Sequence, residues 1–386
     1  MKNLFILFFT TVLAFQFLFG SVNQIEKRTD DADSVRTATI SFVGDLMCHS
    51  PQMDYARTGK DSFDFKPAFR EVKKKLSSSD ITIGNLETTI AGEENRYSGY
   101  PLFNSPDEYL DALKDAGFDV LFTANNHSLD RGKKGIIRTI EKIRELGMSS
   151  IGTYKSQHDR DSIRIFEING IKIALLAYTY GLNGNYISKS EKFLVNVIDT
   201  NLIKLDIGNA REKNADVVLV YFHFGDEYQR KPNTYQKEIV MCAINSGADI
   251  IIGSHTHVIQ PLEYFTSHKN KIGEGIIAYS LGNFFSNQRW RYSDAGAILN
   301  IVLSKNMSNG EVRLSNVSVL PTWVFKGKID NKNEFVILPA DTSASQLPNF
   351  LTKSDRVKLL QSNDDTQKMF SAIHNHANKP LNEKAN

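Results

Sequence analysis

Short apolar runs that end in polar clusters recur along the chain. Each run is rich in β-branched residues, closes on a glycine or another small residue, and leads into polar side chains. Runs without polar alternation suit strands that are buried on both faces of a sheet. The six runs are TATISFVGDLM (37–47), DITIGNLE (80–87), FDVLFTANNH (118–127), ADVVLVYFHFGDEY (215–228), ADIIIGSHTH (248–257) and GIIAYSLGNF (275–284).

Helical segments separate several of these runs. Residues 106–117, 133–147 and 234–247 place apolar side chains at helical spacing, and each segment ends on a glycine suited to stop a helix. The alternation of strands and helices predicts an α/β fold with helices packed on the sheet. After residue 295 two extended segments flank Asn309-Gly310, which predicts a β-hairpin.

The two ends of the chain differ from its centre. One lysine precedes an apolar run from Leu4 to Phe19, and this run is shorter than the ~20 residues of a spanning helix. Residues 1–20 are therefore interpreted as a signal peptide, with an uncleaved N-terminal anchor as the alternative. Either interpretation predicts an extracytoplasmic protein, whether periplasmic, secreted or anchored to the membrane.

The remaining organisation is simple. Residues 21–36 are predicted to be a linker, 37–342 one domain that includes the hairpin, and 343–386 a polar, peripheral tail with a short helix near 353–361. The net charge of +2 and the lack of long charge blocks give no case for nucleic-acid binding. Cys48 and Cys242 are interpreted as buried free thiols, although one disulfide is possible.

The polar clusters are expected to meet at one edge of the sheet, because ligands of open α/β sheets bind beyond the carboxyl ends of the strands. The clusters are rich in imidazole, carboxylate and amide groups and poor in thiols, a donor set that suits Mn, Fe or Zn. The candidate residues are Asp45, His49, Glu87, Asn125, Asn126, His127, His223, Asp226, Glu227, His255 and His257.

His255 and His257 stand two positions apart. In an extended segment such residues point to the same side, so both rings could reach one ion or each could reach one of a close pair. The alternative is a pair of histidines satisfied by ordinary hydrogen bonds. The clustering of five of the nine histidines at these strand ends favours a metal site.

Taken in order, the clusters resemble the motifs of CapA-type poly-gamma-glutamate synthesis proteins over about residues 38–290. That family is similar to the calcineurin-like metallophosphoesterases, so the resemblance implies a four-layer α-β-β-α sandwich with two divalent metal ions above the strand ends. The motifs are VGDLM (43–47), GNLE (84–87), ANNHSLDRG (124–132), HFGDEY (223–228), GSHTHVIQ (253–260) and YSLGNF (279–284).

The resemblance also implies a set of metal ligands. One ion would take the first-strand aspartate and the last histidine, the other an amide and two histidines, and a glutamate would bridge them. In that order the implied ligands are Asp45, His257, Asn126, His223, His255 and the bridging Glu87.

His127 resembles the histidine that protonates a leaving group. Two positions depart from the phosphoesterase pattern. Met47 stands where a histidine is usual, and His49 could substitute for it. Ser128 replaces a carboxylate, which leaves Asp130 as the nearest group able to orient His127.

Other polar positions carry weaker assignments. Asp226 and Glu227 could lie behind the ligands or begin a helix, and Asn283 could be a ligand or form a turn. Arg131 and Tyr228 are candidates for substrate binding. The sequence Arg289-Trp290-Arg291 could hold carboxylates or phosphates, although a solvated loop is the favoured interpretation.

Three functions remain open at this point. The resemblance implies a role in the synthesis or export of a poly-gamma-glutamate-type capsule or envelope polymer, and the residues favour a metal-dependent, phosphoesterase-like hydrolase. A non-catalytic factor that tethers an anionic polymer to a membrane-bound synthase complex is the first alternative, and a general periplasmic metallophosphatase is the second. The expected ligands are accordingly an anionic polymer or a phosphoester.

Overall fold

Two β-sheets pack face to face in the computed structural model, which describes residues 35–269, 271–341 and 347–377. The eight-stranded sheet has the order β14-β13-β12-β1-β2-β3-β4, with β11 beside β1. The six-stranded sheet has the order β5-β6-β7-β8-β10-β9. Aliphatic side chains of β1 and β2 share one core cluster with those of β6, β7 and β8, so the main core lies between the sheets.

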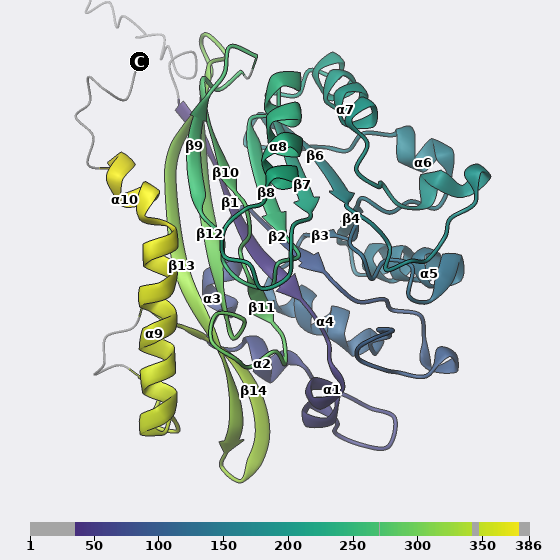
Figure 1. Ribbon diagram of the computed structural model, residues 1–386, viewed down its shortest axis with the longest axis vertical. Coiled ribbons are helices and arrows are strands. Elements are labelled where there is room, and N and C mark those ends of the chain that lie inside the picture. Colours follow the sequence, from purple (N-terminus) through teal and green to yellow (C-terminus); the bar gives the residue numbers. More distant parts are fainter. Residues whose placement is uncertain (1–34, 270, 342–346, 378–386) are drawn as a thin grey trace, which may run out of the picture.

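The strands alternate with helices through most of the chain (Figure 1). The strands are β1 (Val35–Leu46), β2 (Ile81–Leu86), β3 (Val120–Phe122), β4 (Ser149–Ile151), β5 (Ile165–Ile168), β6 (Ile171–Thr179), β7 (Val217–His223), β8 (Ile250–Ser254), β9 (Leu262–Thr266), β10 (Glu274–Ala278), β11 (Asn283–Phe285), β12 (Ala295–Asn306), β13 (Val312–Ile329) and β14 (Lys332–Pro339).

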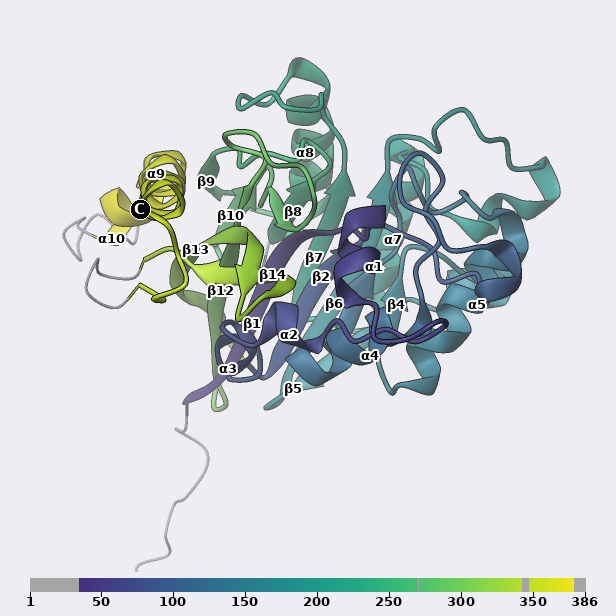
Figure 2. The same cartoon turned by 90° about the horizontal axis from the view of Figure 1, so that it is seen from below.

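Helices cover the outer faces of both sheets (Figures 1 and 2). Side chains of α1, α2 and α4 pack with the eight-stranded sheet, and those of α7 and α8 pack with the six-stranded sheet. The four-layer α-β-β-α sandwich is thereby confirmed. The helices are α1 (Ser50–Ala56), α2 (Lys66–Phe69), α3 (Lys73–Leu76), α4 (Asp107–Ala116), α5 (Gly132–Glu145), α6 (Gln157–Asp161), α7 (Thr200–Glu212), α8 (Thr234–Ser246), α9 (Lys353–Met369) and α10 (Ser371–Ala377), with short 3-10 turns at Glu93–Asn95 and Lys189–Leu194.

The three helices predicted from spacing are α4, α5 and α8. Gly117 and Gly247 end α4 and α8 in the left-handed conformation, with φ of 102° and 106°. The hairpin around Asn309-Gly310 is confirmed as the connection between β12 and β13. One predicted run is shorter than expected, because β10 ends at Ala278 and the chain turns before β11 begins at Asn283.

The carboxy-terminal part holds more structure than the sequence indicated. The short helix expected near 353–361 is the 17-residue α9, which packs along β13 through the buried Leu359. Thr352 caps it by accepting a hydrogen bond from the Asp355 backbone N–H. Residues 343–346 and 378–386 of the predicted tail lie outside the described residues.

The amino-terminal predictions lie mostly outside the described residues. The signal peptide or anchor at 1–20 falls entirely outside them, and the predicted linker meets them only at Val35 and Arg36, which begin β1. Within the described ranges, none of the helices has both the length and the apolar character needed to cross a membrane.

Candidate metal centre

The predicted ligands converge at the carboxyl ends of parallel strands from both sheets. Asp45 on β1 pairs with Asn85 on β2, and His223 on β7 pairs with Ser254 on β8. Parallel pairing brings these ends to the same edge, where the loops that follow each strand meet. Every implied ligand is buried, with at most 3% of its surface exposed: Asp45, Glu87, Asn126, His223, His255 and His257.

Two groups of potential metal ligands share Glu87. The first joins Glu87 with His223 and His255, and the second joins it with Asp45 and His257. Within each group the ligand atoms lie within 4.8 Å of one another. Glu87 Oε1 lies 3.7 Å from His223 Nε2 and 3.8 Å from His257 Nε2. The shared carboxylate is therefore placed where a bridge between two ions would stand.

Unsatisfied polar atoms show that the cavity suits a cation. Glu87 Oε1 and His255 Nδ1 are buried and have no hydrogen-bond partner in the described part of the chain. A buried acceptor left without a donor costs about 1–3 kcal/mol. Carboxylate oxygen and imidazole nitrogen are common ligands of Zn, Mn and Fe, so the residues fit the divalent ions that the sequence predicted.

Burial and neighbouring charges set the protonation of the ligands. Burial lowers the pKa of His255 to about 3, with His257 adding to the effect, and burial lowers the pKa of His223 well below its usual value. Burial and then Asp45 raise the pKa of Glu87 well above its usual value. Burial also acts to raise the pKa of Asp45, but the hydrogen bond and charge of His257 outweigh it and lower that pKa. The two histidines are thus neutral, as metal ligands must be.

Asn85 connects the two carboxylates, and sequence reasoning did not single it out. Its Nδ2 donates to Asp45 Oδ1 at 2.7 Å and to Glu87 Oε2 at 3.3 Å, while its Oδ1 accepts from Asn125 Nδ2 at 3.1 Å. Ser254 Oγ also donates to Asp45 Oδ1. Both residues belong to motifs quoted above, and Asn85 stands two positions before Glu87 in the chain.

His127 is held by the carboxylate expected to orient it. Its Nδ1 lies 2.8 Å from Asp130 Oδ2, which also accepts the Phe103 backbone N–H at 2.7 Å. The Phe103 ring meets the imidazole edge-on at 4.7 Å. Asn183, which the sequence did not indicate, accepts from Asn126 Nδ2 at 3.0 Å and follows β6, a strand also missed.

Both the His255 and the His257 ring reach the site, but the prediction that an extended segment brings them there is wrong. Neither lies in an extended segment, because β8 ends at Ser254 and the two residues have φ of 92° and 58°. The left-handed backbone turns the chain sharply, and the ring centroids lie 6.1 Å apart. The rings therefore serve different ligand groups of the same cavity.

Several candidates lie around the ligands without joining either group. His49 precedes α1, with its Nδ1 3.1 Å from Gln52 Oε1, and burial lowers its pKa to about 4. Asn283 Oδ1 lies 3.1 Å from His257 Nδ1, so Asn283 positions that ring. Asp226 and Glu227 are exposed in the loop after β7.

The two predicted substrate-binding residues differ in placement. The Tyr228 ring lies 6.0 Å from the His257 ring, and its hydroxyl accepts from Gln288 Nε2 at 3.2 Å. Burial raises the pKa of Tyr228 to about 12. Arg131 instead donates to Ser98 Oγ and, at 2.9 Å, to the Leu102 carbonyl, so it fixes the loop that precedes Phe103.

The cysteines are both free. Cys48 is buried, as expected, and burial raises its thiol pKa to about 12. Cys242 is only half-buried on α8, so the expectation of a second buried thiol is wrong.

Comparison with known proteins gives the family. The family model described as bacterial capsule synthesis protein PGA_cap matches residues 39–288. The chain belongs to this PGA_cap family. It is 29% identical to the capsule biosynthesis protein CapA of Bacillus anthracis over 336 residues, covering 83% of this chain and 77% of that protein. It is also 29% identical to the PGA biosynthesis protein CapA of Bacillus subtilis (strain 168), over 93% of this chain and 91% of that protein.

Solved structures that resemble this PGA_cap protein include nucleotidases and a calcineurin-like phosphoesterase. NAD nucleotidase (NadN) of Haemophilus influenzae aligns with a TM-score of 0.46 and 13% identity, covering 87% of this chain and 66% of that one. The calcineurin-like phosphoesterase YfkN of Bacillus subtilis aligns with a TM-score of 0.42 and 14% identity, covering 86% of this chain and 99% of that one.

Proposed function

We propose that this PGA_cap protein acts outside the cytoplasm in the synthesis or export of a poly-gamma-glutamate-type capsule or envelope polymer, through a dinuclear metal-dependent hydrolase site. The observation that carries the enzymatic half is the pair of buried ligand groups that share Glu87. The names of the two CapA relatives support the polymer, and the apolar run at 4–19 supports the location. A membrane-bound polymer synthase is the partner that fits such a role.

Two divalent cations would be held by residues of both sheets. Asp45 and His257 would bind one ion, His223, His255 and Asn126 the other, and Glu87 both. Ions bound in this way supply an activated water and stabilise negative charge on the oxygens of a phosphoryl or acyl group.

The protein's own groups then position the substrate and move a proton. His127 is the candidate general acid, because its Nδ1 faces Asp130 and its Nε2 is left to exchange a proton with a leaving group. Asp130 fixes the tautomer and orientation of that ring. Burial of the ligands keeps bulk water from them, and Tyr228, which is 40% exposed, borders His257.

The direct test measures metal content and hydrolysis together. We expect purified protein to bind about two equivalents of Mn, Fe or Zn and to hydrolyse bis(4-nitrophenyl) phosphate. His257→Ala should lower metal content, because it removes one ligand of a group that has three, whereas His127→Gln should lower turnover about 10²-fold or more with metal retained. His158→Ala is the matched control, since His158 is exposed on α6 and belongs to neither ligand group.

The alternatives make different predictions in the same assay. Full metal occupancy without hydrolysis of any ester or peptide would contradict the enzymatic proposal. It would favour the non-catalytic factor that tethers an anionic polymer. Unchanged metal content in His257→Ala would contradict the ligand assignment itself. Turnover of many unrelated phosphoesters, with no affinity for anionic polymer, would favour the general phosphatase.

A further inference from the structure

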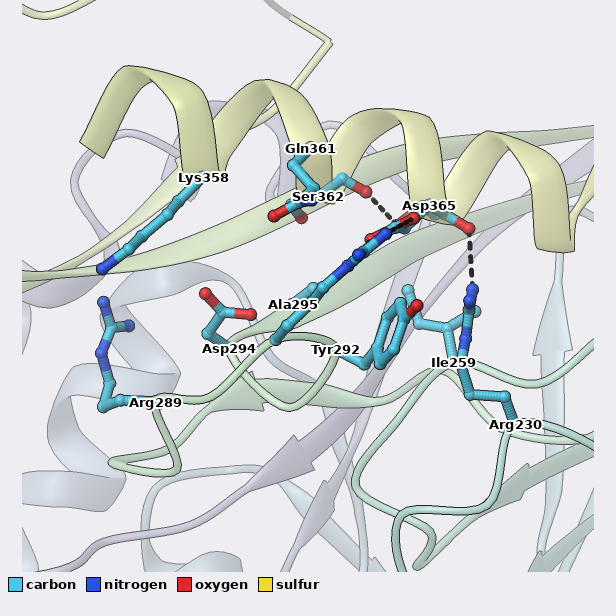
Figure 3. Close-up of a pocket in the computed structure, with 12 residues that line it drawn as sticks. Arg230, Ile259, Arg289, Tyr292, Asp294, Ala295, Lys358, Gln361, Ser362 and Asp365 are labelled. Atoms are coloured by element: carbon cyan, nitrogen blue, oxygen red, sulfur yellow. Dashed lines mark hydrogen bonds and ion pairs between the residues drawn. The ribbon is translucent and has the colours of Figure 1, made fainter. Parts of the chain in front are cut away.

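A pocket lies between α9 and the loop that follows β11 (Figure 3). Its cavity volume is about 100 Å³, and it contains none of the metal-ligand candidates. Arg289, Arg291 and Tyr292 line it from the loop, Lys358 and Asp365 from α9, and Arg230 from the loop between β7 and α8. Three segments far apart in the sequence thus build one concave surface.

Positive charge exceeds negative charge in this pocket. Four cationic side chains line it, against the two carboxylates of Asp294 and Asp365. Asp365 accepts two hydrogen bonds of 3.0 Å from Arg291, and Asp294 accepts one of 2.8 Å from the Trp323 indole. Arg291 therefore pairs with one carboxylate. The other, Asp294, is bound to a neutral donor and lies near enough to Arg289 and Lys358 for their charges to oppose the rise in its pKa that burial causes.

The other three cations have no carboxylate partner within ion-pair distance among the described residues. Arg230 stacks on the Tyr292 ring at 4.1 Å, and its buried Nε has no hydrogen-bond partner in this part of the chain. Arg289 lies over the Trp323 ring at 5.2 Å and donates to the Val324 carbonyl. Arg289 is half-buried, whereas Trp290 and Arg291 beside it are exposed, as expected of a solvated loop.

Two of these cations face each other. Figure 3 shows the ammonium of Lys358 and the guanidinium of Arg289 pointing toward one another from opposite walls of the pocket. Like charges brought together at a partly buried site repel, and an oxyanion between them would turn that repulsion into attraction. Guanidinium and ammonium donors are those that proteins use for carboxylate and phosphate.

We propose that this pocket is an anion subsite that binds one carboxylate or phosphate group of an extended anionic chain. Arg289 and Lys358 hold the anion, and Arg230 supplies further positive charge. Nothing in the metal centre is needed for this binding, because the two sites share no residue.

A row of side chains links the subsite to the metal centre. The Tyr228 ring lies 6.0 Å from His257 on one side and 5.2 Å from Trp290 on the other. Trp290 is half exposed and stands between Arg289 and Arg291 in the chain. On the proposed function, an anionic polymer engaged at the metal centre would pass over Tyr228 and Trp290 and place a later charged group in the subsite.

The two tryptophans give a local readout, because the chain has only Trp290 and Trp323 and both adjoin the pocket. Tryptophan fluorescence of the full chain, with and without EDTA, would be titrated with inorganic phosphate, with γ-linked oligoglutamate and with the neutral γ-linked oligoglutamine. We expect saturable binding of at least one anion and none of the neutral peptide. A preference for oligoglutamate identifies carboxylate as the group bound, and a preference for phosphate identifies phosphate.

Three variants distinguish anion binding in the subsite from nonspecific electrostatic attraction to the protein surface. Lys358→Gln and Arg289→Gln should each weaken anion binding about three- to tenfold, as expected for one charged donor in a partly exposed site. Lys368→Gln, an exposed lysine of the same helix outside the pocket, should stay within about twofold of the wild type. Because Lys358 is exposed, its variant tests the subsite even where Arg289→Gln fails to fold.

Binding that is unchanged in Lys358→Gln, or absent in the wild type for both anions, would overturn the subsite. Loss of hydrolysis with anion binding intact would instead count against the proposed function alone. Retained binding after EDTA treatment supports the independence of the two sites, and loss of it contradicts that independence.

Discussion

At the scale of single residues, the position of Asp45 depends on the glycine before it. A Cβ at Gly44 would stand 1.8 Å from the Gly282 carbonyl oxygen, which accepts the Asp45 backbone N–H at 2.9 Å. Gly44→Ala must therefore push β1 away from the segment that leads into β11. We expect a loss of about 3 kcal/mol of unfolding free energy and, because Asp45 moves, a lower metal content.

Gly208 provides the matched control for this substitution. It lies on the exposed side of α7, and a Cβ there would meet no atom within 4 Å. Gly208→Ala should raise the unfolding free energy by about 0.5–1 kcal/mol, because alanine restricts the unfolded chain and favours the helix. Chemical denaturation of both variants measures the difference. A Gly44→Ala protein as stable as the wild type would contradict the close approach of the two strands.

The sequence was informative about the metal ligands, whose side chains are chemically distinctive. Histidine and carboxylate at strand ends indicated the ligands, because such side chains seldom follow an apolar run without a reason. Asn85, Ser254 and Asn183 gave no comparable signal, since amides and hydroxyls are common in turns. The left-handed backbone at His255 and His257 was also invisible, because neither residue type demands it.

At the scale of elements, α9 depends on one buried leucine and a row of polar contacts. Leu359 packs with Trp323 and Leu338, whereas the next residue, Leu360, is 39% exposed. Leu359→Ala should cost about 3 kcal/mol of unfolding free energy, and Leu360→Ala less than about 1 kcal/mol. Equal effects in thermal or chemical denaturation would show that the helix does not pack as described.

The same helix shows why some elements escape prediction from periodicity. Its buried face includes Ser362, Asp365 and Thr366, which bond to the Thr322 carbonyl, to Arg291 and to the helix itself. A polar buried face gives no apolar stripe. By contrast, β6 reads IKIALLAYT, and the criterion that found the six runs would have included it. The parallel core strands were predictable because burial on both faces demands continuous apolar residues.

At the scale of the whole molecule, the metal centre joins the two sheets. Asp45 lies near the end of β1 and Glu87 follows β2 in one sheet, whereas His223 ends β7 and His255 and His257 follow β8 in the other. To the two ligand groups, one sheet contributes only carboxylates and the other contributes only imidazoles. Bound ions would therefore link the layers and stabilise only the assembled sandwich, since the unfolded chain holds no such site.

Glu87→Gln tests this coupling because it changes one charge and no volume. In the metal-free protein Glu87 lies beside Asp45, and burial and that carboxylate raise its pKa well above the usual value. The neutral amide should therefore leave metal-free stability equal or higher. With Mn or Zn supplied at about 100 times the dissociation constant, each bound ion should add about 2.7 kcal/mol to the wild type. The variant lacks the shared ligand and should gain much less.

In scanning calorimetry, we expect metal to reverse the order of the melting temperatures of the wild type and Glu87→Gln. Under EDTA the Glu87→Gln protein should melt at or above the wild-type temperature, and with metal it should melt several degrees below it. His158→Ala should follow the wild type in both conditions, because its histidine is exposed on α6 and belongs to neither ligand group. If metal shifted the wild type and Glu87→Gln equally, the ions would be bound elsewhere. A variant less stable than the wild type even under EDTA would show that Glu87 stabilises the fold without metal.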